Sequence, residues 1–143
     1  MFNLSSFEAC LQAIQAGGPL YDLATQSDHA SLYGGHDAQV CAHGIGGVAL
    51  CLSGRMLPAA ERIEQDIESA RLLGEPGSLA HALDFATLFY RMCEDTDKTI
   101  QNANALTDCA TEHGFADYEL RARAFRGWAM ARAGDVETGL PEM

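Results

Sequence analysis

The sequence predicts an all-α fold, an α-solenoid of helix pairs with a 40-residue period. Three sets of small or apolar residues recur at that spacing: Ala42, Ala82 and Ala122; Ile45, Phe85 and Phe125; and Val48, Leu88 and Trp128. The second helix of the first two pairs is expected to stop at Gly74 and Gly114, again 40 residues apart. One such pair cannot bury its own apolar face, so we expect successive pairs to stack on one another.

The length and composition are consistent with a single domain over residues 1–143. Hydrophobic residues make up 48% of the 143-residue chain, which is long enough to bury a substantial core. We expect an N-terminal cap over residues 1–35. Three repeats follow, and the third is incomplete; they span residues 36–74, 76–114 and 116–143.

The charge balance argues against nucleic acid and anionic lipid as partners. Twenty acidic residues against nine basic ones give a formal charge of -11, and Lys98 is the only lysine. Binding to phosphate backbones or to acidic membrane surfaces begins with clustered Lys and Arg. We therefore expect no nucleic-acid partner and no membrane association.

The cysteines and the absence of long apolar runs predict a cytoplasmic protein. Five cysteines occur without a CxxC pair, and an odd number of thiols without a signal peptide is typical of a reducing compartment. The longest apolar candidate, Ile45 to Leu52, is far shorter than the roughly 18 residues of a membrane span.

Taken in order, the first expected helix runs from about Ser6 to Ala16. Ser5 or Ser6 can cap it, and Gly17-Gly18-Pro19 ends it. The pattern from Leu20 to Gly35 is weaker and contains at most two helical turns, so we assign it to the cap.

The first repeat is expected to pair a helix over Asp37–Leu52 with one from Leu57-Pro58 to Gly74. Glycines at 44, 46 and 47 each cost the first helix about 1 kcal/mol in propensity relative to alanine. Close packing, expected to come from another backbone, must offset that cost.

The later helices are expected over Ser78–Met92, Asp97–His113 and Asp117–Ala133. The first of these is apolar nearly all round, which predicts burial between neighbours. After Gly134 the opening of another second helix recurs, but Pro141 and the end of the chain arrive before we expect it to form. Either more chain follows in a parent protein or another subunit covers this end.

Four groups of motifs occur along the chain: Leu32-Tyr33-Gly34-Gly35-His36-Asp37 with Val40-Cys41-Ala42, Ser69-Ala70-Arg71 with Leu73-Gly74, Glu112-His113-Gly114-Phe115, and Arg126-Gly127-Trp128-Ala129-Met130-Ala131 with Gly134. Together they resemble the C-terminal tetratricopeptide-like (TPR-like) segment of bacterial multidomain signalling proteins of the adenylate/guanylate cyclase or LuxR/MalT-type ATPase families, and the resemblance implies a TPR-like solenoid. The resemblance implies a non-catalytic part of a larger signalling protein. A phosphate-binding loop would need a glycine-rich turn ending in lysine, and Lys98 stands in an acidic helix start.

Residues with metal-binding or nucleophilic side chains also have structural explanations. His36, Asp37, Cys41 and His43 lie within eight residues, but a helix start favours a capping acid, and we expect no metal and no cofactor there. Burial makes a thiol inert, so we expect no Cys-His catalysis and no enzyme activity. A cluster of arginines on the fifth repeat helix either pairs with acids of a neighbouring helix or binds an anionic partner: Arg121, Arg123, Arg126 and Arg132.

The predicted function is a protein-protein interaction or regulatory scaffold that binds a protein or peptide. In such stacks the first helix of each pair lines the groove, which gives three candidate rows: Gln39, Leu79 and Glu119; His43, Leu83 and Arg123; and Leu50, Tyr90 and Met130. The alternative is a small-molecule sensor with its ligand near His43, Tyr90 and Arg123. We also expect a homodimer through Phe125, Trp128 and Leu140, because the last helix pair is incomplete.

Overall fold

The computed structural model describes residues 4–21, 30 and 35–143, and the chain divides into two compact units. Unit 1 is Met1–Ala82 and unit 2 is Leu83–Met143, so the boundary falls inside one helix. The described residues form seven α-helices and one 3-10 helix, without a β-strand, which confirms the all-α class. Most of the segment from Leu20 to Gly35 lies outside the described residues, and a single domain stays a prediction.

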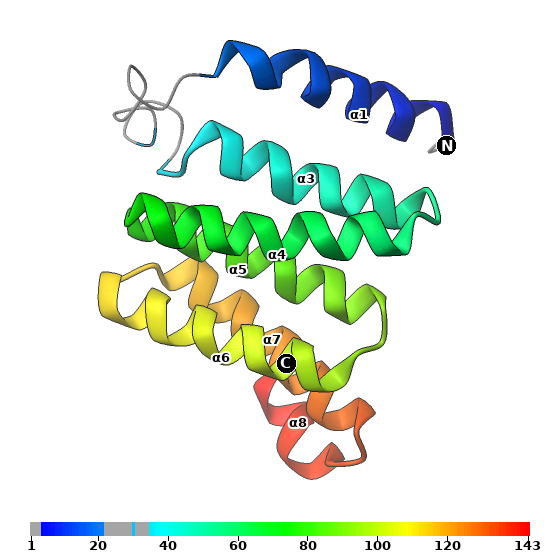
Figure 1. Cartoon of the computed structure of the whole chain (residues 1–143). Helices are drawn as coiled ribbons and strands as arrows, with labels where there is room; N and C mark the ends of the chain where they lie inside the picture. The colour runs from blue at the N-terminus through cyan, green and yellow to red at the C-terminus, as the bar shows by residue number, and fades with distance from the viewer. Residues whose placement is uncertain (1–3, 22–29, 31–34) are drawn as a thin grey trace. The chain divides into compact units, whose positions relative to one another are not determined.

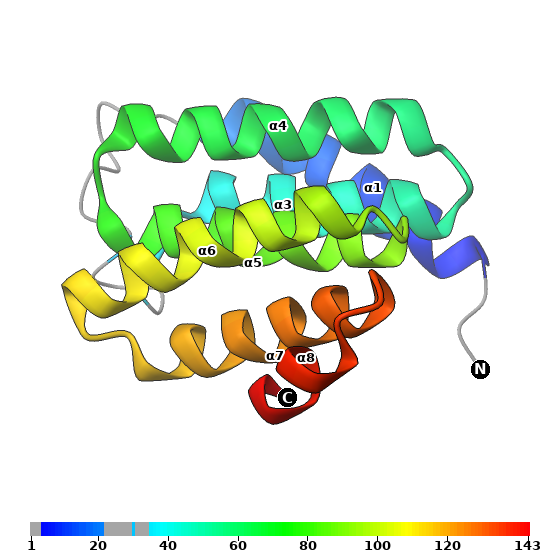
Figure 2. The same cartoon turned by 90° about the horizontal axis from the view of Figure 1, so that it is seen from below.

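Unit 1 is built around α3. Its elements are α1 (Leu4–Gly17), η1 (Gly18–Leu20), α3 (Ala38–Leu52), α4 (Met56–Leu73) and the first part of α5 (Pro76–Met92). The central helix α3 packs against both α1 and α4 (Figure 1). A short turn joins α3 to α4, which runs back antiparallel to it (Figure 2). The core of the unit includes Val40, Ala59, Ile63 and Ala70, each at most 1% exposed.

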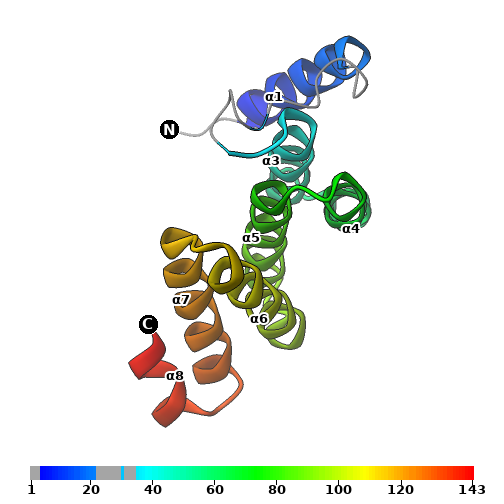
Figure 3. The same ribbon diagram turned by 90° about the vertical axis from the view of Figure 1, so that its left-hand side faces the viewer.

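Unit 2 contains the remainder of α5 and three further helices. These are α6 (Thr96–His113), α7 (Ala116–Arg132) and α8 (Val136–Glu142). The helix α7 packs against both α6 and α8 (Figure 3). Phe89 and Leu106 are the largest fully buried side chains of its core, and small residues let the helices approach closely: Ala103, Ala110, Ala122 and Ala129.

The helix boundaries repeat every 40 residues. The first helices of the pairs end at Leu52, Met92 and Arg132, and the second helices begin at Met56, Thr96 and Val136. The turns between them share a left-handed residue, with φ of 78° at Gly54, 57° at Glu94 and 105° at Gly134. The second helices end at Leu73 and His113, and each is followed by a left-handed glycine C-cap, Gly74 and Gly114. The period seen in the sequence is thus also a period of local backbone structure.

The glycines of α3 make room for side chains. A Cβ atom added to Gly47 would lie 2.6 Å from Cδ1 of Ile63, and one added to Gly46 would lie 3.2 Å from Nη1 of Arg62. Close packing was predicted correctly. The expectation that another backbone lies against them holds only in part, because the nearest atoms at both glycines belong to side chains of α4. At Gly47 a backbone atom also lies close, the carbonyl oxygen of Ala59, 3.6 Å from the added Cβ atom.

The prediction that the last second helix cannot form was also wrong, because α8 is present and contains Pro141. Two glycines explain its docking. A Cβ atom on Gly127 would lie 2.5 Å from the carbonyl oxygen of Gly139, and a Cβ atom on Gly139 would meet the carbonyl of Gly127 at the same distance. The two backbones therefore touch, which stabilises a helix too short to persist alone. Among the described residues, no helix combines the length and the apolar character needed to cross a bilayer.

Candidate functional site

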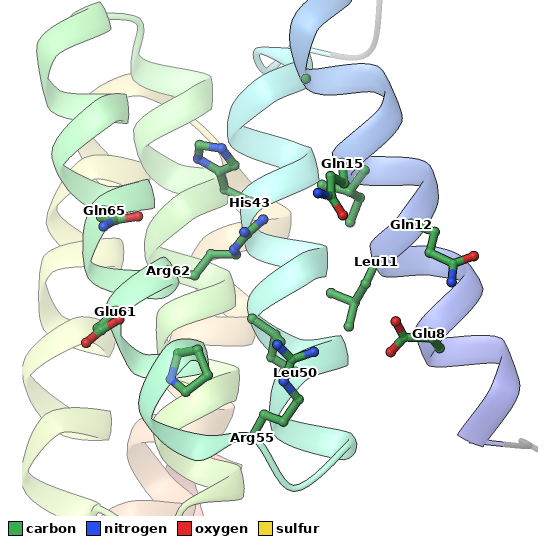
Figure 4. A pocket seen from close by; sticks show the side chains of 13 residues that line it. Glu8, Leu11, Gln12, Gln15, His43, Leu50, Arg55, Glu61, Arg62 and Gln65 are labelled. Atoms are coloured by element: carbon green, nitrogen blue, oxygen red, sulfur yellow. The ribbon is translucent and has the colours of Figure 1, made fainter.

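A groove in unit 1 lies between α1, α3 and α4 and encloses a cavity of about 620 Å³. Its wall from α1 carries Glu8, Leu11, Gln12, Ile14 and Gln15. From α3 come His43 and Leu50, and from α4 and the turn before it come Arg55, Pro58, Glu61, Arg62 and Gln65. Figure 4 shows Arg62 reaching from α4 toward α1, and Leu11 pointing from α1 into the same space.

The groove gathers two of the three basic side chains of unit 1, Arg55 and Arg62; the third is Arg71. Within the described part of the chain, neither groove arginine lies within ion-pair distance of an acid. Arg62 is half-buried, whereas Arg55 is exposed. Two cationic donors are thus available beside apolar side chains.

His43 stands beside Arg62 and is neutral near pH 7. Burial lowers the pKa of His43, and the positive charge of Arg62 lowers it further, against a smaller opposite effect of Asp37. Its Nδ1 atom is buried and has no hydrogen-bond partner among the described residues. A neutral imidazole can accept or donate one hydrogen bond to a ligand in the groove.

A second, smaller cavity of about 400 Å³ adjoins the groove. It shares Ile14 and His43 with the groove, and its lining also includes Ala13, Tyr21, Ala38, Gln39 and Ala42. Most of these side chains are apolar.

A polar cluster lies where α3 begins. The side chain of Asp37 caps α3 by accepting hydrogen bonds from the backbone N–H groups of Gln39 (2.8 Å) and Val40 (3.2 Å). The Tyr21 hydroxyl donates to the same carboxylate (2.5 Å), and the Asp37 N–H donates to the Ser78 hydroxyl oxygen (2.7 Å). The predicted capping role of Asp37 is confirmed, and this cap also ties α3 to the start of α5.

Next to this cap lie three side chains that we call the His-Cys cluster: His36, Cys41 and His81. The imidazole rings of His36 and His81 are stacked, with centroids 3.8 Å apart and planes 5° apart. One ring nitrogen of each histidine and the Cys41 sulfur lie within 4.8 Å of one another. Burial raises the pKa of the Cys41 thiol, and the nearby Asp66 raises it further.

Asp66 of α4 is the least expected buried group. Its side chain is 0% exposed, and neither carboxyl oxygen has a hydrogen-bond partner in the described part of the chain. Burial raises its pKa to about 8, Asp37 adds to the rise, and Arg62 opposes it. Asp66 is therefore largely protonated near neutral pH.

The basic residues of unit 2 are mostly engaged within the unit. Arg121 pairs with Asp84 (3.0 Å), Arg126 with Glu142 (2.5 Å) and Arg132 with Glu94 (2.7 Å). Structural pairing, one of the two interpretations of this arginine cluster, is thus confirmed for these three. Arg123 is exposed and has no ion pair among the described residues.

The residues predicted to line one groove are divided between the units. Gln39, His43, Leu50 and Leu79 belong to unit 1, and Leu83, Tyr90, Glu119, Arg123 and Met130 belong to unit 2. His43 and Leu50 line the groove of unit 1, and Gln39 lines the adjoining cavity. Leu50, Leu83 and Tyr90 are 5%, 2% and 4% exposed, so they lie mainly in the core.

The residues predicted for a dimer interface lie in unit 2. Phe125 and Trp128 are half-buried, and the guanidinium carbon of Arg91 lies 5.8 Å and 5.3 Å from their ring centroids. Leu140 of α8 is 57% exposed. The argument for a dimer assumed that α7 lacks a second helix. Because α8 forms, that premise was wrong, and the dimer stays a prediction.

Sequence reasoning did not identify Arg55, Arg62, Leu11 or His81. The groove depends on how α1 lies against α3 and α4, which the repeat pattern does not specify. One signal was available for the arginines, because Arg55 and Arg62 are the first two basic residues of the chain. Another was available for His81, which stands 40 residues after Cys41 at the equivalent repeat position.

Comparison with known proteins gives a relative whose name states no activity. It is similar to "Uncharacterized protein R02095" of Rhizobium meliloti (strain 1021), with 29% identity over 140 residues. That alignment covers 96% of this chain and 13% of the relative, so the chain spans about an eighth of that protein's length. No protein-family model matches the chain, and no solved structure matches it.

Proposed function

We propose that this chain is a non-catalytic, TPR-like interaction module, and that the groove of unit 1 binds an extended acidic segment of a partner protein. The carrying observation is the half-buried Arg62, which has no ion pair among the described residues and stands beside Leu11, Ile14 and Leu50. The 40-residue recurrence of helix boundaries and the resemblance to signalling proteins support the TPR-like part.

The charge of the occupant follows from the burial of the groove's ionic groups. Glu8 and Glu61 also line the groove but are exposed, so water already solvates them. Arg62 is partly withdrawn from water, and a charged group in that position gains more from a partner than an exposed one does. A carboxylate can accept two parallel hydrogen bonds from a guanidinium, which makes Asp or Glu the side chain that fits best.

The size and lining of the groove favour a peptide that also carries an apolar side chain. A cavity of about 620 Å³ falls within the roughly 300 to 1,000 Å³ of ordinary ligand sites. Leu11 and Ile14 from α1 face Leu50 from α3, and they offer apolar contact next to the arginines. The formal charge of -11 repels acidic segments elsewhere on the surface, so binding is confined to this groove.

The test is a selection of displayed random peptides on the full chain. We expect enrichment of sequences that combine Asp or Glu with an apolar residue. The Arg62→Gln variant should bind a selected peptide at least about tenfold more weakly, because one charge-assisted pair contributes roughly 1.5 to 3 kcal/mol. Arg71→Gln is the matched control, since Arg71 is an exposed arginine of the same helix outside the groove lining. A lack of enrichment, or equal binding by Arg62→Gln and wild type, would contradict the proposal.

A small-molecule sensor is the second candidate, and the adjoining apolar cavity favours it. This cavity of about 400 Å³, lined by Ala13, Ile14 and Ala42, would hold a compact apolar ligand with a polar group near His43. Thermal-shift screening with small amphipathic molecules distinguishes this function. A ligand of that kind should raise the melting temperature of the wild type and have no effect on Ala42→Phe, whose ring fills the cavity.

A further inference from the structure

The His-Cys cluster assembles three metal-ligating side chains from two segments that are far apart in sequence. His36 precedes α3, Cys41 lies in its first turn, and His81 lies in the second turn of α5. The candidate ligand atoms, one ring nitrogen of each histidine and the sulfur of Cys41, lie within 4.8 Å of one another. All three residues are half-buried, so an ion can reach them from solvent.

Hydrogen bonds hold the two ligand-bearing segments together. The Asp37 N–H donates to the Ser78 hydroxyl oxygen at 2.7 Å, which joins the residue after His36 to the first turn of α5, directly before the turn that carries His81. The Asp37 carboxylate caps α3 and so fixes the turn that carries Cys41. The capping role expected from the sequence thus coexists with a ligand role for its neighbours.

The buried carboxyl group of Asp66, close to Cys41, is a second and independent feature of this region. Its carboxyl group is fully buried and has no hydrogen-bond partner within the described residues, yet it interacts electrostatically with both Cys41 and Asp37. Buried polar groups without partners are rare, and a bound ion is one recognised explanation for them. A cation beside Cys41 would favour the ionised form of this carboxyl group, and the two opposite charges would then offset each other.

We propose that His36, Cys41 and His81 bind a divalent ion of the zinc class, with Asp66 as the buried carboxylate that offsets its charge. Imidazole nitrogen together with thiolate sulfur is the donor set that Zn²⁺ prefers, whereas Mg²⁺ and Ca²⁺ take oxygen ligands. Cys41 binds as the thiolate and Asp66 gives up its proton to become the carboxylate, and both protons pass to solvent. This proposal replaces the expectation of no metal, because the fold brings His81 close to His36 and Cys41 as a third possible ligand.

Binding requires a small rearrangement of the stacked rings. The lone pairs of imidazole nitrogens lie in the ring planes, and planes only 5° apart cannot both contain one ion. Bonds of about 2.0 Å to nitrogen and about 2.3 Å to sulfur also require ligand atoms somewhat closer than 4.8 Å. The rings of His36 and His81 therefore rotate out of their stack when the ion binds.

Cobalt(II) provides the test, because it replaces zinc in such sites and reports the thiolate directly. The full chain is reduced, freed of metal with a chelator and titrated with Co²⁺. We expect one ion per chain, with a sulfur-to-cobalt charge-transfer band that Zn²⁺ abolishes. The band should be absent in Cys41→Ser and retained in Cys51→Ser, a matched control on the same helix. Asp66→Asn should weaken the affinity about 10- to 100-fold, as expected for a group that supports the ligands.

The cobalt titration can contradict or support the metal site. A charge-transfer band that survives in Cys41→Ser, or no band in folded wild type, would overturn it. Loss of the band in His81→Gln with an unchanged metal-free circular dichroism spectrum would support it, because folding is then not the cause. A metal site that holds while the peptide selection fails would leave the two proposals separate, since their residues do not overlap.

Discussion

The two compact units differ in how they use their charged side chains. In unit 2, Arg121, Arg126 and Arg132 form ion pairs, Arg91 lies over two aromatic rings and Lys98 donates to the Tyr90 hydroxyl (2.9 Å). In unit 1, none of the three arginines has an ion pair among the described residues. Most basic side chains of unit 2 therefore have partners within the unit, whereas the arginines of unit 1 are available to bind a ligand or a partner protein.

The buried carboxyl groups show the same contrast. Asp84 of unit 2 is 8% exposed and pairs with Arg121 at 3.0 Å. Asp66 of unit 1 is 0% exposed and has no hydrogen-bond partner in the described part of the chain. A buried polar group that lacks a partner costs stability, so its presence points to a ligand. This contrast is why the proposed binding activity is assigned to unit 1 and a structural role to unit 2.

The largest expected effect concerns pH and Asp84. Burial raises the pKa of Asp84 to about 6, although Arg121 lowers it. An unfolded aspartate titrates near about 3.9, so between these values the folded chain holds a proton that the unfolded chain has lost. Raising the pH through this window should therefore remove an Asp84 contribution on the order of 2 to 3 kcal/mol from the free energy of unfolding, and this contribution should not change further above the window.

Urea unfolding at a series of pH values checks this prediction. The Asp84→Asn variant lacks the titrating group, so the difference between wild type and variant isolates its contribution from that of other acids. Equal slopes in the two proteins between about pH 4 and pH 6 would mean that Asp84 titrates normally and that unit 2 is less well buried.

The next effect compares close packing in the two units. Gly47→Ala would drive a methyl group into the buried Ile63 side chain, and Gly127→Ala would drive one into the Gly139 backbone. Both should destabilise by about 1 to 3 kcal/mol, the usual cost of overpacking. In Gly127→Ala, amide hydrogen exchange should rise mainly in α8, since that helix can undock. Gly17→Ala is the control, because nothing lies within 4 Å of the added methyl group, and a similar loss there would exclude packing as the cause.

The smallest effect is a gain in stability at Asp66. Replacing this carboxyl group with an apolar side chain in Asp66→Leu removes a buried polar group without a partner. We expect the metal-free protein to gain about 1 to 2 kcal/mol, and to lose its cobalt affinity at the same time. Asp84→Leu should gain less, because it also breaks the pair with Arg121. Thermal unfolding in a chelator measures both variants, and destabilisation by Asp66→Leu would show that Asp66 is structurally required.

The sequence predicted local structure far better than the site. The helix boundaries follow from local signals, such as the capping glycines Gly74 and Gly114 and the spacing of apolar residues within each helix. The 40-residue period repeats these local signals along the chain. The helix α8 was missed because Pro141 was weighed as a helix breaker, while the contact between Gly127 and Gly139 that holds α8 is tertiary. The groove and the His-Cys cluster likewise depend on contacts between helices, which periodicity alone cannot supply.

The most direct test of the contrast between the units compares one arginine from each. Arg62 of unit 1 and Arg123 of unit 2 both lack an ion pair among the described residues, but only Arg62 lines the groove. Fluorescence anisotropy of a selected acidic peptide would be measured on wild type, Arg62→Gln and Arg123→Gln. We predict at least about a tenfold rise in Kd for Arg62→Gln and less than about a twofold change for Arg123→Gln. Equal losses in both variants would mean that net charge, rather than the groove of unit 1, determines binding.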